Sequence, residues 1–230
     1  MSKGESPAAI FASEQPAGAA VYNFQGGCLY SGARDAETRR PHGLGAMLFG
    51  GESCVYVGEW AQGRRHGVGR MVWSNRDQYE GCWEDDTMCG QGEFMRADGS
   101  NYKGSWKDGR PQGEGQMVHT SGRQYEGNWV QGKIDGTGAF RFESGAVYDG
   151  PWKANLMADP AKESLLRGMT SESFTHTTRR SSVGKTRSSL LLINDFEHSY
   201  QIYPRNFKDW LVYTTTLFFV GLGIYLIMRA

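Results

Sequence analysis

The sequence predicts a mainly β protein: an elongated single-layer antiparallel sheet of stacked β-hairpins, plus one C-terminal transmembrane α-helix. Three observations lead to this prediction. Glycine and aromatic residues are abundant, with 32 Gly, 7 Trp, 11 Tyr and 11 Phe in 230 residues. A tyrosine recurs every 23 residues between positions 56 and 148, and residues 211–228 form an uncharged apolar run. Turn-dense repeat folds are rich in glycine, whereas disordered chains are poor in aromatic residues.

The repeat consists of a tyrosine, a glycine two residues later, a tryptophan two residues after that, and then a Gly-x-Gly pair. Because strand side chains alternate between faces, Tyr, Gly and Trp share one face. Both glycines of Gly-x-Gly are expected on that face too, where they leave room for the rings of a continuous aromatic core. The repeat-core residues are Tyr56, Gly58, Trp60, Gly67, Gly69, Tyr79, Gly81, Trp83, Gly90, Gly92, Tyr102, Gly104, Trp106, Gly113, Gly115, Tyr125, Gly127, Trp129, Gly136, Gly138, Tyr148, Gly150 and Trp152.

A hairpin turn is expected after each tryptophan. In residues 107–110, Asp-Gly supplies the positive φ that a two-residue turn needs, and the second strand is expected to begin at the following Gly-x-Gly. The two ends of the array are atypical. The first copy starts at Tyr30 and has Ala33 and Arg34 where tryptophan is expected, with an insertion at 35–41. The last copy, 148–152, is expected to lack a second strand, and Pro151 suits an edge strand.

The pattern YxGxWxxGxxxGxGxxxxxxGxx, from about Tyr30 to Trp152, resembles the MORN (membrane occupation and recognition nexus) repeat. The resemblance implies an elongated, gently twisted single-layer sheet. Members of this family are overwhelmingly non-catalytic modules: scaffolds at membrane junctions, cytoskeletal subunits, or regulatory additions to enzymes. Repeats followed by an anchor resemble, in order of parts, a minimal junctophilin.

We divide the chain into five segments: an N-terminal extension (1–21), the repeat array (22–157), a Ser/Thr-rich basic linker (158–193), a juxtamembrane segment (194–210) and the transmembrane helix (211–228). A helix of that last length rises about 27 Å, enough to cross a hydrocarbon core. Trp210, Tyr213 and Arg229 are expected at the membrane interface. The competing interpretation is a buried core helix or further strands. A tail-anchored, single-pass topology leaves the repeats on the cytosolic or mitochondrial matrix side.

The linker has a basic bias. Arg179, Arg180, Lys185 and Arg187 could contact anionic lipid headgroups or an acidic partner, and phosphate on Ser181 or Ser182 would cancel their charge. A solvated linker without a specific contact is an equal alternative. The Gly-Lys-Thr at 184–186 is not a P-loop, because that motif requires glycine at position 179.

Nothing in the sequence predicts catalysis. We expect no catalytic, cofactor-binding or metal-binding residue, and a net charge of zero does not favour nucleic-acid binding. The acidic residues 84–86 are expected in a solvated turn, in preference to a weak cation site. Cys82 and Cys89 fall in one hairpin and could approach each other, although free thiols are expected in a reducing compartment.

The function expected from these observations is a membrane-tethered scaffold that binds a protein partner through the sheet face and membrane lipids through its C-terminal helix. The alternative is an accessory subunit of a large, multi-subunit membrane assembly, such as a mitochondrial respiratory complex in a divergent eukaryote. Thr214, Gly221 and Gly223 in the apolar run would suit helix packing in such an assembly. A lipid-sensing module is a third hypothesis. The membrane itself, mitochondrial or an endoplasmic reticulum/plasma membrane junction, stays open.

Overall fold

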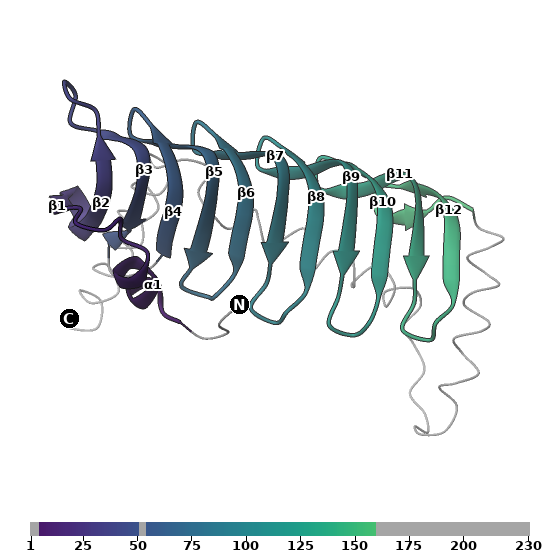
Figure 1. The fold of residues 1–230 in the computed structure, drawn as a ribbon. Coiled ribbons are helices and arrows are strands. Elements are labelled where there is room, and N and C mark those ends of the chain that lie inside the picture. The colour runs from purple at the N-terminus through teal and green to yellow at the C-terminus, as the bar shows by residue number, and fades with distance from the viewer. Residues whose placement is uncertain (1–4, 51–53, 160–230) are drawn as a thin grey trace, which may run out of the picture.

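The computed structural model describes residues 5–50 and 54–159, and in them the strands form one open antiparallel sheet in chain order (Figure 1). This confirms the predicted single sheet of stacked hairpins. The elements are α1 (Pro7–Ser13), β1 (Val21–Phe24), the 3-10 turn η1 (Gln25–Gly27), β2 (Cys28–Arg34), β3 (Pro41–Leu48), β4 (Cys54–Ala61), β5 (Arg64–Trp73), β6 (Gln78–Glu84), β7 (Thr87–Met95), β8 (Asn101–Lys107), β9 (Arg110–Val118), β10 (Gln124–Val130), β11 (Lys133–Arg141), β12 (Val147–Lys153) and β13 (Leu156–Met157).

The predicted transmembrane helix at 211–228 and the juxtamembrane segment lie outside the described residues, as does the linker beyond Asp159. Within the part of the chain that the structure describes, no helix is long and apolar enough to cross a membrane.

The turns after the tryptophans have two central residues, both with positive φ, as in Asp108 (φ 51°) and Gly109 (φ 72°). This geometry matches the twist of a hairpin, and the Asp-Gly prediction is confirmed there. The second strand, however, begins directly after the turn, because Lys107 already pairs with Arg110. The expectation that it begins at Gly-x-Gly was therefore wrong by three residues.

The two glycines of each Gly-x-Gly have different roles, which corrects the prediction that both make room for a ring. The first one has a left-handed backbone, with φ 83° at Gly113, and it accompanies a register shift between Gly104 and Trp106. It forms a β-bulge. The second, Gly115, lies directly opposite Gly104, and a Cβ there would overlap the Tyr102 ring. Only the second glycine lies beneath a tyrosine.

The aromatic column forms the main core on one face of the sheet, which we call the inner face. Tyr102 is fully buried, and its ring meets Trp106 of its own strand and Trp129 of the next hairpin edge to face, at centroid distances of 5.2 and 5.1 Å. The Tyr102 hydroxyl donates a hydrogen bond to the Ser105 carbonyl at 3.0 Å. The Trp129 indole donates to the Gly115 carbonyl of the preceding hairpin at 3.2 Å. Every hairpin is thus joined to its neighbour by ring contacts and a hydrogen bond.

The ends of the sheet differ from expectation. The last hairpin does have a second strand, because Trp152 and Lys153 of β12 pair with the two residues of β13. At the other end, helix α1 lies on the opposite, outer face of the sheet (Figure 1). Ser6 caps α1 by accepting from the Ala9 N–H at 3.2 Å. The sequence pattern of residues 1–21 did not predict this helix.

Candidate functional site

The outer face of the sheet changes character along its length. At the N-terminal end, Ile10 and Phe11 of α1 are buried against an apolar patch of the sheet, made of Ala46, Leu48, Val55 and Val72. Beyond this patch, the corresponding positions of later strands carry Gln78, Met95, Asn101 and Val118. The helix therefore covers the apolar part of the outer face, and the polar part continues past it.

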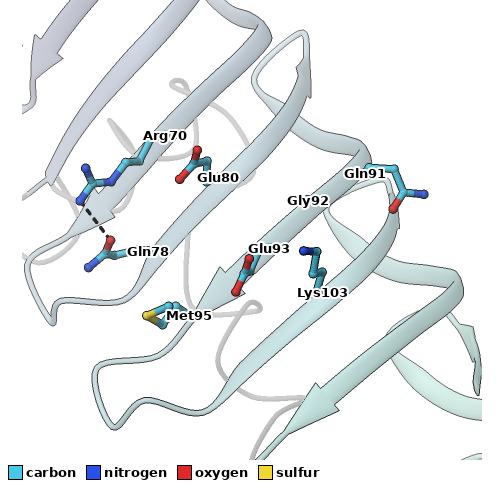
Figure 2. Close-up of a pocket in the computed structure, with 8 residues that line it drawn as sticks. All are labelled: Arg70, Gln78, Glu80, Gln91, Gly92, Glu93, Met95 and Lys103. Atoms are coloured by element: carbon cyan, nitrogen blue, oxygen red, sulfur yellow. Dashed lines mark hydrogen bonds between the residues drawn. The ribbon is translucent and has the colours of Figure 1, made fainter. Parts of the chain in front are cut away.

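A shallow depression of about 320 Å³ lies on the polar part, over β5 to β8. Figure 2 shows the residues that line it, which lie on these neighbouring strands. They are Arg70, Gln78, Glu80, Gln91, Gly92, Glu93, Met95 and Lys103. Apart from Gly92, which contributes backbone only, the side-chain alternation of the repeat predicts that these positions face away from the aromatic column. Only the structure shows that they share one hollow.

Charges of both signs cross this depression in one cross-strand row. Arg70 pairs with Glu80, Glu80 with Glu93, and Glu93 with Lys103, each as directly opposed residues of neighbouring strands. The two adjacent glutamates repel each other, and like charges directly opposed are destabilising. Arg70 is also held by a hydrogen bond to the Gln78 amide oxygen at 3.1 Å (Figure 2). The centre of the row is therefore a place where a cation from a partner would be favoured.

The repeat-core tyrosines and tryptophans lie on the inner face and are buried. Trp106 is 3% exposed, and every tyrosine of the repeat core is at most 1% exposed. The glycine of Tyr-x-Gly-x-Trp pairs with the second glycine of Gly-x-Gly across the strands beneath the tyrosine rings, as Gly104 does with Gly115 and Gly127 with Gly138. The aromatic signature residues therefore hold the fold together, and they are not exposed for binding.

The acidic turn 84–86 is only partly solvated, which corrects the prediction for Asp86. Its carboxylate accepts from the Arg65 side-chain Nε and from the Arg65 backbone N–H, both at 3.0 Å. The two side chains are only 8% and 9% exposed. The Arg65 guanidinium also stacks over the Trp83 ring, 4.3 Å from its centroid.

This ion pair replaces the residues that stand there in later hairpins. The partners of Trp83, Trp106 and Trp129 across their hairpins are Met88, Pro111 and Ile134, whereas the partner of Trp60 is Arg65. The turn position of Asp86 is glycine in the two following hairpins, at 109 and 132. Arg65 thus places a charge where later hairpins have an apolar residue, and Asp86, in the turn of the next hairpin, neutralises it.

The thiols fall into two pairs. Cys28 and Cys54 are buried on the inner face, and burial raises the pKa of Cys54 to about 12. Cys82 and Cys89 face each other across β6 and β7, with their Sγ atoms 3.1 Å apart. Burial, and next the hydrogen bond with Cys82, raise the pKa of Cys89 to about 12. All four are free thiols.

The remaining polar side chains of the described residues form no metal-binding cluster. His42 and His66 are exposed near the turns. Within residues 5–50 and 54–159, no group of three or more His, Cys, Asp or Glu side chains could hold a metal ion. The candidate linker contacts (Arg179, Arg180, Lys185 and Arg187) and interface residues (Trp210, Tyr213 and Arg229) lie outside the described residues.

Comparison with known proteins identifies the repeats. The MORN repeat model matches residues 56–78, 79–101, 102–122 and 125–147. No curated protein matches the chain. Among solved structures, one similar chain is the TCP domain of Drosophila melanogaster SAS-4 (dCPAP), in complex with a proline-rich motif of Ana2 (dSTIL). The identity is 12% and the TM-score 0.23, over 59% of this chain and 85% of that one, too weak a likeness for any inference. Residues 56–147 therefore carry four MORN repeats.

Proposed function

We propose that this chain is a membrane-tethered scaffold whose outer sheet face binds a protein partner at the depression over β5 to β8. Proteins built from MORN repeats are generally non-catalytic interaction scaffolds. The observation that carries the proposal is the division of the outer face. A short helix of the chain itself already packs on its apolar end, and the hollow beside it presents Met95 next to a row of charged side chains.

The charges of the hollow define the partner chemistry. Glu80 and Glu93 are adjacent and lie between Arg70 and Lys103. A peptide segment that places a lysine or arginine over the two glutamates and an apolar side chain against Met95 would complement the hollow. Charge complementarity of this kind mainly sets specificity and the rate of association.

A charge-reversal pair tests the binding surface. In the full 230-residue chain, Glu80→Lys with Glu93→Lys should abolish co-purification of a partner that the unchanged chain retains in mild detergent. Glu126→Lys is the matched control. Glu126 continues the cross-strand row of Glu80 and Glu93 on β10, which is two strands beyond β8 at the edge of the hollow. A partner retained equally by both variants would place binding elsewhere.

The tether is supported by sequence alone, from the uncharged apolar run 211–228. Deleting residues 211–230 should move the protein from the membrane fraction to the soluble fraction, without affecting partner binding by the repeats. If the truncated chain stays with membranes, the repeats or the linker suffice for attachment. Salt-sensitive binding of residues 1–200 to anionic liposomes would then favour the lipid-sensing alternative.

The same purification separates the scaffold from the accessory-subunit alternative. A scaffold should release its partner at high salt, because the contact is charged and exposed. A salt-resistant complex of fixed composition and stoichiometry would instead indicate a structural subunit of a larger membrane assembly.

A further inference from the structure

Two thiols face each other across one hairpin on the outer face. Cys82 of β6 and Cys89 of β7 are directly opposed in the strand register, and their Sγ atoms are 3.1 Å apart, with the Cys89 thiol donating toward Cys82. Both side chains are half-buried and so open to small reagents, whereas Cys28 and Cys54 are buried in the aromatic core. Cys82 and Cys89 are therefore accessible to a small reagent, and Cys28 and Cys54 are not.

We propose that Cys82 and Cys89 form a reversible dithiol–disulfide site, oxidised by a low-molecular-weight disulfide. Directly opposed residues of antiparallel strands have Cα atoms about 4.5–5.5 Å apart, inside the range of about 4.4–6.8 Å that a disulfide spans. The sulfurs need to approach by only about 1 Å to reach bonding distance. The strands therefore already have the spacing of the oxidised form.

The hydrogen bond gives the two sulfurs different roles. Cys89 donates toward Cys82, so the roles that follow from this direction are Cys82 as the attacking sulfur and Cys89 as the resolving one. The Cys82 thiolate attacks one sulfur of the small disulfide RSSR, whose S–S bond breaks, and RS⁻ leaves. Cys89 then loses its proton, attacks the Cys82 sulfur of the mixed disulfide, and expels the second RS⁻. Two protein thiols are oxidised, and RSSR is reduced to two RSH.

The position of the pair connects it to the proposed binding surface without depending on it. Cys89 is on β7, the strand that also contributes Gln91, Glu93 and Met95 to the hollow. Cys82 is opposite the exposed Val68 of β5, on the same outer face. A small disulfide can therefore reach the pair from the open side of the sheet.

Mass spectrometry of the whole 230-residue chain tests the proposal directly. The chain is equilibrated with glutathione and glutathione disulfide, acid-quenched, denatured, alkylated and digested with trypsin. Residues 77–96 form one tryptic fragment that contains both thiols. This fragment should lose two hydrogen atoms and take up no alkyl group, and dithiothreitol should restore both thiols. Cys28 and Cys54 are internal controls and should remain alkylated. A fragment that stays doubly alkylated in glutathione disulfide, or carries only glutathione adducts or inter-chain bonds, overturns the proposal.

Two single variants test the order of attack. Cys89→Ser should trap a glutathione adduct on Cys82, because the resolving thiol is missing. Cys82→Ser should leave Cys89 acquiring glutathione about tenfold more slowly. Equal rates in the two variants would contradict the assigned roles, even where the disulfide forms in the unchanged chain.

Discussion

The buried ion pair between Arg65 and Asp86 provides the sharpest test of how the repeats stack. In Asp86→Gly, the guanidinium loses its carboxylate but keeps its hydrogen bond to the backbone carbonyl of residue 86 and its place over Trp83. Leaving a buried charge unpaired costs about 3–5 kcal/mol. Glycine at the positive φ of residue 86 recovers about 1 kcal/mol. The free energy of unfolding should therefore fall by about 2–4 kcal/mol.

The second part of the test restores the pattern of the next hairpin. Arg65→Met with Asp86→Gly gives the methionine and glycine found at 88 and 109. Replacing a buried ion pair by well-packed apolar residues is often neutral or stabilising, so the double variant should lie within about 1 kcal/mol of the unchanged chain. Arg65→Met alone should cost about 3–5 kcal/mol, because it leaves the buried Asp86 carboxylate unpaired. The coupling energy between the two sites should then be at least about 4 kcal/mol.

The assay is urea unfolding followed by tryptophan fluorescence, to which Trp83 beside the pair contributes. Asp85→Gly is the matched control, because Asp85 is in the same turn with a similar backbone and forms an exposed ion pair with Arg64. Its loss should cost less than about 1 kcal/mol. If the effects of Arg65→Met and Asp86→Gly simply add, the coupling energy is below about 0.5 kcal/mol. In that case the ion pair does not explain why residues 65 and 86 both differ from the equivalent residues of later hairpins.

Three further outcomes follow from the core, each measured by urea unfolding. Trp106→Ala should cost about 3–5 kcal/mol, and a loss below about 1 kcal/mol would contradict its burial. Gly115→Ala should cost about 1–3 kcal/mol because the new methyl group overlaps the Tyr102 ring, whereas Gln116→Ala, on the exposed face, should change little. Burial raises the pKa of Tyr30 to about 12, above the value near 10 of the unfolded chain. The folded state holds this proton more tightly, so stability should be constant below about pH 10 and fall between pH 10 and 12. A flat profile to pH 12 would contradict the burial of the phenols.

Much of the fold follows from residues of the repeat itself. The period of two places Tyr102 and Trp106 on one face of a strand, and Asp-Gly at 108–109 specifies the turn, so both were predictable from local chemistry. The bulge at Gly113 was not, because its sequence context resembles that of Gly115. Their roles differ only through the backbone register of the neighbouring strands.

The candidate site was less predictable because it depends on contacts between distant residues. Asp86 is buried through Arg65, which is 21 residues away. Helix α1 buries only Ile10 and Phe11, too few apolar residues for a helical pattern, and it depends on an apolar patch that the sheet must first assemble. The hollow on the outer face likewise arises from four strands, although side-chain alternation does predict that Glu80 and Lys103 face outward.

The indole hydrogen bonds of the array all point from one hairpin to the preceding hairpin, and this polarity matters for how the chain folds during synthesis. Each repeat-core tryptophan donates backward, as Trp83 does to Gly69 and Trp129 to Gly115, so a hairpin leaving the ribosome finds its acceptor already folded. The first copy fits this polarity, since it carries Arg34, stacked on Tyr22, in place of tryptophan. Removing hairpins from the N-terminus of the array therefore leaves one indole N–H without its acceptor, which should lower the free energy of unfolding by about 1–3 kcal/mol. Removing hairpins from the C-terminus leaves no indole N–H without an acceptor. Comparing the stabilities of the two truncation series would measure this vectorial assembly.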